Sequence, residues 1–247
     1  MAAFPSLPRV GIISQARMTS TRLPGKVLLP IGGRPMLHYH LARLRTAGLP
    51  LYLAITTNTA DNSLADFATT QAIPCVRGSE DDVLSRYWQC VEQHELDIIV
   101  RVTSDCPLLD GALIGQGVAE YIKQADSRLY LSNVLERTFP RGLDFEVFSR
   151  ELLAEAFHNS TLLSDREHVT PYIHQNRSGT VRFQHITHPT DRSNYRLTVD
   201  TAEDFELVRV LIEQYQAHQL TTTELLDLLA AHPELVALNA HIEQKKA

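Results

Sequence analysis

The chain has 247 residues, of which 44% are hydrophobic and 21% charged, so it can bury a sizeable core and is not disordered. Its net charge of −6 argues against a general nucleic-acid binder, which carries a basic surface. No apolar run approaches the ~18 residues of a membrane helix, and residues 1–8 have no apolar signal core. Three cysteines without a CxxC pattern are expected to be reduced thiols, so we expect a cytoplasmic protein.

Charge is unevenly distributed along the chain. The first 60 residues contain seven Lys and Arg residues and no Asp or Glu, whereas the remaining 187 carry a net charge of −13. A purely basic segment in an acidic protein indicates a local anion site, because a positive cleft concentrates anionic ligands. A chance distribution is the alternative.

The first half of the sequence alternates between two patterns. Short apolar runs rich in β-branched residues are typical of buried parallel strands, and they occur at residues 10–14, 51–56, 75–76 and 97–103. Helices are expected between them, the second of them capped by Asp61, at residues 35–48, 61–71 and 80–94. This alternation predicts a parallel sheet with right-handed crossovers, whose ligands bind beyond the carboxyl ends of the strands.

The alternation weakens after residue 129. Strands are expected at 143–148 and 181–186, and the run at 196–199 is another buried-strand pattern. Helices are expected at 151–159, 167–175, 202–216 and, interrupted by Pro233, from 221 onward. We expect one domain, 1–247, comprising a nucleotide half (about 9–128), an acceptor and metal half with mixed strands (about 129–216) and a helical tail (217–247).

The loop at residues 16–26, ARMTSTRLPGK, directly follows the first strand. It offers two guanidinium groups, one ammonium, three hydroxyls and a flexible glycine. Arg forks match phosphate oxygens, Lys acts as a point charge, and α/β proteins place phosphates at this position. The loop is neither GxxxxGK[ST] nor GxGxxG, so it is not a known phosphate loop of those types. An ordinary solvated basic loop is the alternative.

Two aspartates follow buried strand patterns and could reach the same cleft. Asp105 comes after the run at 97–103, and Asp200 after the run at 196–199. One or two carboxylates are typical of protein-bound Mg²⁺. Each also has a structural alternative: Asp105 could cap the turn before Pro107, and Asp200 or Thr201 could cap the following helix.

The loop resembles the signature of the sugar-acid cytidylyltransferases, the CMP-KDO and CMP-sialic acid synthetases, through the pattern A-R-x-x-S-x-R-L-P-G-K. Over about residues 10–215 the chain is most similar to the spore-coat polysaccharide biosynthesis SpsF-like branch of that group. Further segments carry this resemblance: RGSEDDVLSRY (77–87), RVTSDCPLLD (101–110), RGLDFEVF (141–148), REHVTPYI (166–173) and YRLTVDTAEDF (195–205). It implies an α/β fold with a mostly parallel, Rossmann-like sheet of the nucleotide-diphospho-sugar transferase (GT-A-like) type.

The resemblance also implies residue roles. Mg²⁺ would be held by Asp105 and Asp200. The nucleotide would be bound by Ala16, Arg17, Ser20, Arg22, Lys26, Arg77, Ser79 and Asp105, with catalysis by Arg17, Arg22 and Lys26. Of these, Arg77 and Ser79 would contact the base. The acceptor side would be lined by Arg141, Asp144, Glu146, Arg166, His168 and Arg196, although His168 could instead be a structural histidine beside Glu167.

The expected reaction is Mg²⁺-dependent transfer of CMP from CTP to a small anionic acceptor, a sugar acid or a relative of one, with release of pyrophosphate in surface polysaccharide biosynthesis. Three alternatives remain open: a phosphorylated acceptor giving a CDP-linked product, a GT-A-like glycosyltransferase, and a non-catalytic nucleotide-binding protein. No nucleic-acid or membrane partner is expected. A homodimer is expected from the resemblance, and the tail could support it or pack against its own domain.

Overall fold

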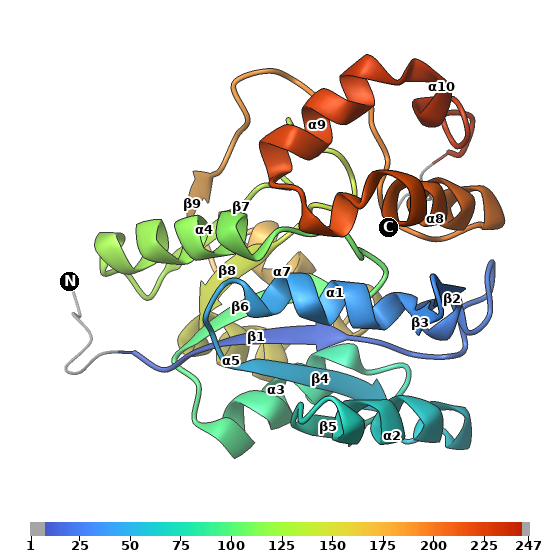
Figure 1. The fold of residues 1–247 in the computed structure, drawn as a ribbon. Coiled ribbons are helices and arrows are strands. Elements are labelled where there is room, and N and C mark those ends of the chain that lie inside the picture. The colour runs from blue at the N-terminus through green and yellow to red at the C-terminus, as the bar shows by residue number, and fades with distance from the viewer. Residues whose placement is uncertain (1–7, 244–247) are drawn as a thin grey trace.

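A seven-stranded sheet lies between two layers of helices in the computed structural model, which describes residues 8–243 (Figure 1). Its strand order is β5-β4-β1-β6-β8-β7-β9. The strands are β1 (Val10–Gln15), β4 (Leu51–Thr56), β5 (Cys75–Gly78), β6 (Ile98–Thr103), β7 (Leu129–Ser132), β8 (Glu146–Ser149) and β9 (Arg182–His185). β5, β4, β1 and β6 are parallel, whereas β8 is antiparallel to both of its neighbours. The expected α/β fold with added mixed strands is confirmed.

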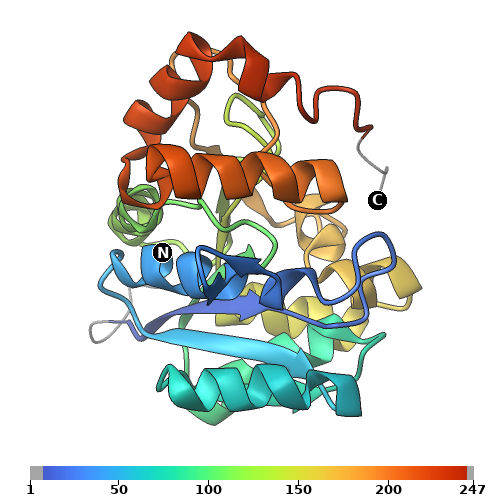
Figure 2. The ribbon, with the colours of Figure 1, turned by 45° about the vertical axis from the view of Figure 1, so that its right-hand side comes forward.

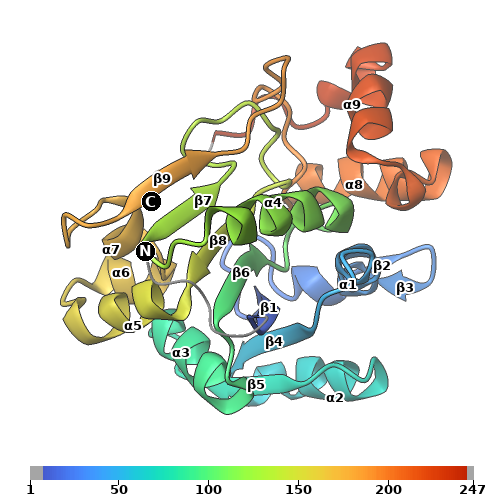
Figure 3. The same cartoon turned by 90° about the vertical axis from the view of Figure 1, so that its left-hand side faces the viewer.

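The sheet separates two hydrophobic cores. Successive side chains of a strand point to opposite faces, so Ile12 belongs to one core and Ile13 to the other. One face is covered by α1 (Met36–Arg45), α2 (Asn62–Thr70), α4 (Gly111–Gln124), α8 (Ala202–Tyr215) and α9 (Thr222–Ala231). The other is covered by α3 (Val83–His94), α5 (Arg150–Asn159), α6 (Leu163–His168) and α7 (Pro171–His174), as Figure 3 shows from the side. No helix within residues 8–243 is long and apolar enough to cross a membrane.

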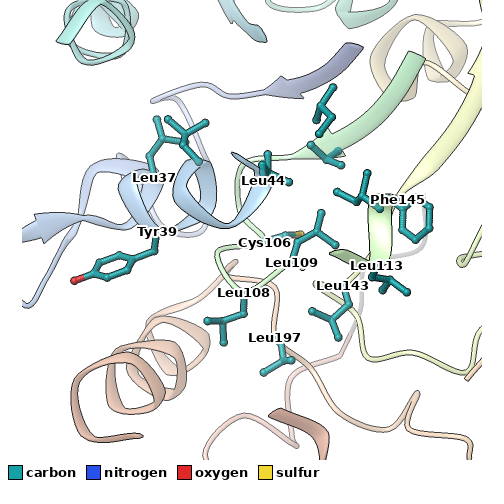
Figure 4. Packing of buried hydrophobic residues seen from close by; sticks show 14 of the residues in the cluster. Leu37, Tyr39, Leu44, Cys106, Leu108, Leu109, Leu113, Leu143, Phe145 and Leu197 are labelled. Carbon is teal, nitrogen blue, oxygen red and sulfur yellow. The ribbon is translucent and has the colours of Figure 1, made fainter. Parts of the chain in front are cut away.

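Apolar side chains fix the loop that follows β6. Cys106, Leu108 and Leu109 are buried and pack between Leu44 of α1 and Phe145, just before β8 (Figure 4). Leu44 and Phe145 come from different halves of the chain, so the loop is held by contacts on two sides. The packing of this loop therefore fixes the position of Asp105, which is next to Cys106.

The structure corrects four expectations on secondary structure. The expected helix at 167–175 is two helices, since Val169 between α6 and α7 has a φ of 71°. The run at 196–199 is buried but forms only one isolated bridge, from Arg141 to Arg196. β8 begins at Glu146, three residues later than expected from the 143–148 pattern. α4 and β7 were not expected.

Glycine explains why α4 is hard to recognise in the sequence. The helix contains Gly111, Gly115 and Gly117, and glycine lowers helix propensity. A Cβ on Gly117 would lie 2.5 Å from the Phe145 ring, so the close approach of helix and sheet requires its absence. Tertiary packing thus overrides local propensity here.

The tail packs against its own domain. It contains η3 (Ala217–Gln219), α9 and α10 (Pro233–Val236), and Leu225, Leu226 and Leu229 belong to the main core. Thr222 donates to Asp110 through its backbone N–H at 3.0 Å and its hydroxyl at 2.9 Å. Dimerisation stays a prediction. Residues 1–7 and 244–247, which include most of the segment predicted to lack a signal core, lie outside the described chain.

A buried hydrogen-bond chain joins β1, α1 and the loop after β6. The Ser14 hydroxyl lies 2.8 Å from His40 Nε2 and 2.7 Å from the Ser104 hydroxyl, and His40 Nδ1 lies 2.8 Å from the Cys106 carbonyl oxygen. The carbonyl only accepts, so Nδ1 carries the proton and Nε2 accepts from Ser14. His40 is fully buried, and this burial lowers its pKa to about 4.

We expect His40 to make folding pH-dependent. Its folded pKa lies below its ordinary value of 6.5, so the unfolded chain takes up the proton first as the pH falls. Its contribution is full above pH 6.5 and is lost between about pH 6.5 and 4, amounting to about 3 kcal/mol. Urea unfolding of the wild type and His40→Gln across this range measures it. Parallel pH curves for the two proteins would contradict it.

Gly142 follows Arg141 of the isolated bridge, and its backbone packs against the segment of Arg196. Its φ is 100°, and an added Cβ would lie 2.4 Å from the Leu197 carbonyl carbon. We expect Gly142→Ala to cost about 3 kcal/mol, because strain and overlap add. Gly33→Ala is the matched control, since Gly33 has a φ of 79° with no atom within 4 Å of the added Cβ. Equal losses in chemical denaturation would exclude the overlap.

Candidate functional site

A polar cleft of about 220 Å³ opens at the carboxyl ends of β1 and β6, where the long blue loop after β1 begins (Figure 2). Residues from β1 and the loop after it, α3, β6 and the loop after it, α6 and the segment before α8 meet there. The cleft is lined by Gln15, Ala16, Arg17, Ser20, Thr21, Arg22, Lys26, Val27, Val83, Arg86, Thr103, Ser104, Asp105, Glu167, His168 and Asp200. Its position agrees with the expected edge of the sheet.

The loop at 16–26 is anchored at both ends. Its start is held by backbone bonds, with the Ala16 N–H donating to the Ala54 carbonyl at 3.2 Å and the Met18 N–H to Asp61 Oδ1 at 2.8 Å. Gly25, with a φ of 70°, donates its N–H back to the Met18 carbonyl at 2.9 Å. Hydrogen bonds therefore hold the loop in one conformation, unlike an ordinary solvated loop.

Asp61 has a different role from the expected helix cap. Its carboxylate makes no capping bond to α2 and instead accepts from the Thr56 N–H at 2.9 Å and the Thr56 hydroxyl at 2.7 Å, besides Met18. The side chain is completely buried. Asp61 thus ties the phosphate-type loop to the end of β4.

Lys26 lies between the two predicted metal ligands. Its ammonium donates to Asp105 Oδ2 at 2.8 Å, Asp200 Oδ1 at 2.9 Å and the Val199 carbonyl at 2.7 Å. Burial by itself would lower the pKa of Lys26, but the two carboxylates outweigh it and raise the pKa. Burial likewise acts to raise the pKa of Asp105, and Lys26 nevertheless holds it down at about 2. Both partners are therefore charged at neutral pH.

The second oxygen of Asp200 is also paired. Arg196 donates to Asp200 Oδ2 at 2.9 Å, and Arg22 lies 3.1 Å from the same atom. Arg196 further donates to Asp204 Oδ1 at 2.8 Å. Three cations and three carboxylates thus form one cluster with no net charge, which we call the ion cluster: Arg22, Lys26, Arg196, Asp105, Asp200 and Asp204.

Asp200 is not the cap of α8. Thr201 is the N-cap, and with Asp204 it forms a capping box in which each side chain accepts from the other's backbone N–H. This leaves the Asp200 carboxylate, 13% exposed, free to face the cleft. Of the two residues considered as the cap of this helix, Thr201 is confirmed and Asp200 is wrong.

Six of the eight residues predicted to bind the nucleotide line the cleft. They are Ala16, Arg17, Ser20, Arg22, Lys26 and Asp105. Arg77 and Ser79 do not line it. Arg77 donates instead to the Thr56 carbonyl at 3.0 Å, the Asn58 carbonyl at 3.0 Å and Asn62 Oδ1 at 2.9 Å. The Ser79 hydroxyl accepts from the Asp82 N–H at 3.1 Å. Their geometry does not support the predicted base contacts.

Of the six residues predicted to bind the acceptor, only His168 lines the cleft. Glu146 is buried and pairs with Arg101, Tyr130 and Thr170, so its carboxylate is already engaged. Asp144 accepts from Arg137 at 2.6 Å.

The three arginines of that prediction also lie elsewhere. Arg166 donates to the Phe157 carbonyl at 2.8 Å and lies 3.5 Å from Asp82, and Arg196 belongs to the ion cluster. Arg141 contributes its backbone to the bridge with Arg196 and does not line the cleft. Arg141 and Arg166, two cations that would suit a phosphorylated acceptor, therefore do not line the cleft.

Arg86 was not predicted from the sequence. It lines the cleft from α3 and is only 2% exposed. An arginine on an amphipathic helix ordinarily indicates the solvent face, which is why it was missed. Its spacing from Val83, Tyr87 and Cys90, all buried, was the available signal, since these positions share one helical face.

Similarity to known proteins agrees with this site. Residues 10–228 match the model of the family described as cytidylyltransferase. The spore coat polysaccharide biosynthesis protein SpsF of Bacillus subtilis is 32% identical over 232 residues, covering 90% of this chain and 94% of SpsF. A cytidylyltransferase structure from Leptospira borgpetersenii superposes with a TM-score of 0.89 at 32% identity, covering 97% of this chain and all of that one.

A more distant structure shares the fold. It is a CMP:2-keto-3-deoxy-manno-octonic acid synthetase complexed with CTP, with a TM-score of 0.61 at 18% identity, covering 84% of this chain and 99% of that chain. The family match spans most of the sequence, and the SpsF match spans most of both proteins. The chain therefore belongs to the cytidylyltransferase family and is a nucleotidyltransferase related to the sugar-acid cytidylyltransferases.

Proposed function

We propose that the protein transfers a cytidylyl group from CTP to a small anionic, sugar-type acceptor and releases pyrophosphate. The observation that carries this proposal is the position of Lys26, which joins the loop at 16–26 to Asp105 and Asp200 in one cleft. Cations for phosphate and carboxylates for a metal thus lie side by side. Such a transfer depends on positioning and charge neutralisation more than on a protein nucleophile.

The ion cluster suits an incoming nucleotide because its charges can exchange partners. Lys26 and Arg22 neutralise Asp105 and Asp200 in the free protein. A triphosphate would draw these two cations, together with Arg17, onto its oxygens and stabilise the charge of the departing pyrophosphate. Arg196 would stay with Asp200 and Asp204 and hold the carboxylate in place.

We propose Mg²⁺ as the cofactor, held by Asp105 and Asp200. Their oxygens and the Val199 carbonyl oxygen all lie within 2.9 Å of the Lys26 nitrogen, so three hard oxygen donors converge on one point. Residues 8–243 contain no group of three or more His, Cys, Asp or Glu residues placed to hold a metal. Such a sparse protein donor set is typical of Mg²⁺, which completes its shell with phosphate and water. Bound there, it would neutralise phosphate charge.

The acceptor would approach from the side of α6, where Glu167 and His168 line the cleft. Since SpsF is named for spore coat polysaccharide biosynthesis, we propose a role in surface polysaccharide biosynthesis for this protein too. We propose a sugar acid as the acceptor, because the CMP:2-keto-3-deoxy-manno-octonic acid synthetase that shares this fold is named for one. We further propose that the protein acts in the cytoplasm, in line with its three free cysteines.

CTP should stabilise the protein more than UTP, ATP or GTP does. At a hundred times its Kd, a ligand specific for the folded state adds about 2.7 kcal/mol, which for a domain of this size raises Tm by roughly 5–10 °C. Thermal shifts with each nucleotide, with Mg²⁺ and with EDTA, measure this. Equal shifts for all four nucleotides would refute the cytidylyl assignment, and a CTP shift insensitive to EDTA would refute the metal.

Lys26→Met should lower pyrophosphate release by about a hundredfold or more, because it removes a cation that stabilises the leaving group. Arg22 and Arg196 still neutralise Asp200 in this variant, so the fold should persist, which circular dichroism checks. Lys123→Met is the matched control, since that lysine is 77% exposed and pairs with the surface residue Glu120. Unchanged pyrophosphate release in Lys26→Met would exclude the proposed role.

A further inference from the structure

Arg86 is a buried cation that forms no ion pair within residues 8–243. It is 2% exposed, and its Nε and Nη1 atoms have no hydrogen-bond partner among residues 8–243. Its stem runs against β5, where a Cβ on Gly78 would lie 2.8 Å from the Arg86 Cγ. A buried guanidinium left unpaired is costly, so this side chain is expected to have a partner that arrives from outside the chain.

The residues that line the cleft are of two chemical kinds. Arg22, Lys26, Asp105 and Asp200 are its charged residues around the ion cluster. Its apolar lining residues are Ala16, Val27 and Val83, which are 6%, 2% and 3% exposed. A triphosphate carries a strongly bound hydration shell and suits the charged residues, whereas a planar heterocycle suits apolar side chains.

Arg86 lies beside Val83, one of these apolar lining residues. It follows Val83 by one helical turn, so the two side chains share a face of α3. Its charged neighbours include Arg17, which lies in the loop after β1, and Asp61 and Glu80, which both bond to that loop. None of them approaches within 4.0 Å to form an ion pair with Arg86.

We propose that Arg86 donates hydrogen bonds to O2 and N3 of the cytosine ring, which packs against Ala16, Val27 and Val83, and thereby selects CTP over UTP. This rests on the proposed function, which supplies the nucleotide. O2 and N3 of cytosine are adjacent acceptors, and guanidinium is donor-only. In uracil N3 carries a hydrogen, so the same arginine would face a donor and lose one bond. A site that leaves a buried polar group unpaired rejects the wrong ligand strongly.

We therefore assign to Arg86 the contact with the base that the resemblance implied for Arg77. Arg77 uses its three donor nitrogens on acceptors of the β4–α2 segment. Arg86 has the unsatisfied donors and the place in the cleft. Both residues lie in the segment at 77–87. The proposed contact with the base is thus made from α3 and not from the end of β5.

Calorimetric binding of CTP, UTP, CMP, UMP and tripolyphosphate to the wild type and Arg86→Met tests the proposal. We expect the Kd for CTP to rise about ten- to a hundredfold and that for UTP to rise less, so that the preference for CTP shrinks. CMP should follow CTP, and tripolyphosphate should bind unchanged. The Tm of the free variant should rise or hold, because a buried unpaired charge is gone.

Two controls separate folding and function from recognition. Arg86→Lys keeps the charge but loses the planar fork, and it should lower the CTP preference even if Arg86→Met does not fold. Arg45→Met, at an exposed site on α1, should bind every ligand as the wild type does.

Two results would overturn the proposal: an unchanged ratio of CTP to UTP affinity in the Arg86 variants, or a loss of tripolyphosphate binding, which would place Arg86 on the phosphates. A wild type that binds CTP and UTP equally would instead refute the cytidylyl assignment. A wild type that prefers CTP yet releases no pyrophosphate would refute the transfer reaction, while the comparison of Arg86 variants would still decide its contact with the base.

Discussion

The contact of one ammonium with two carboxylates organises this molecule. Lys26 comes from the loop after β1, Asp105 from the end of β6, and Asp200 from the segment before α8, 174 residues after Lys26. Opposite charges at this depth compensate the cost of burying one another. The contact therefore joins the two halves of the chain at the point where the chemistry is proposed to occur.

The surrounding structure fixes the positions of these three groups. Asp105 follows a loop held by Cys106, Leu108 and Leu109 in the core and by His40 through a carbonyl. Asp200 is freed from helix capping because its neighbour Thr201 takes that task with Asp204. A neutral cluster without ligand is also ready to exchange partners, since each cation given up to phosphate leaves a carboxylate available to a metal.

The remainder of the cleft divides recognition from chemistry. Phosphate transfer is proposed at the ion cluster. The lining of the cleft also includes Ala16, Val27, Val83 and the buried guanidinium of Arg86. Affinity for polyphosphate and preference for a base can thus reside in different side chains, and substitutions in one set should leave the function of the other largely intact.

The sequence by itself determined the parallel half of the sheet, since β-branched runs such as residues 97–103 and capped helices between them are local patterns. It also indicated the loop at 16–26 and, with the resemblance, Asp105 and Asp200, because each directly follows a strand-like run. Tertiary structure decided what local pattern cannot encode. Gly117 makes room for Phe145, Asp61 holds the loop instead of capping a helix, and Glu146 is engaged by Arg101. Whether an arginine faces solvent, a carbonyl or a cleft depends on neighbours distant in sequence. For this reason the sequence predicted Arg77 at the nucleotide and did not predict Arg86, although Arg86 is the one that lines the cleft.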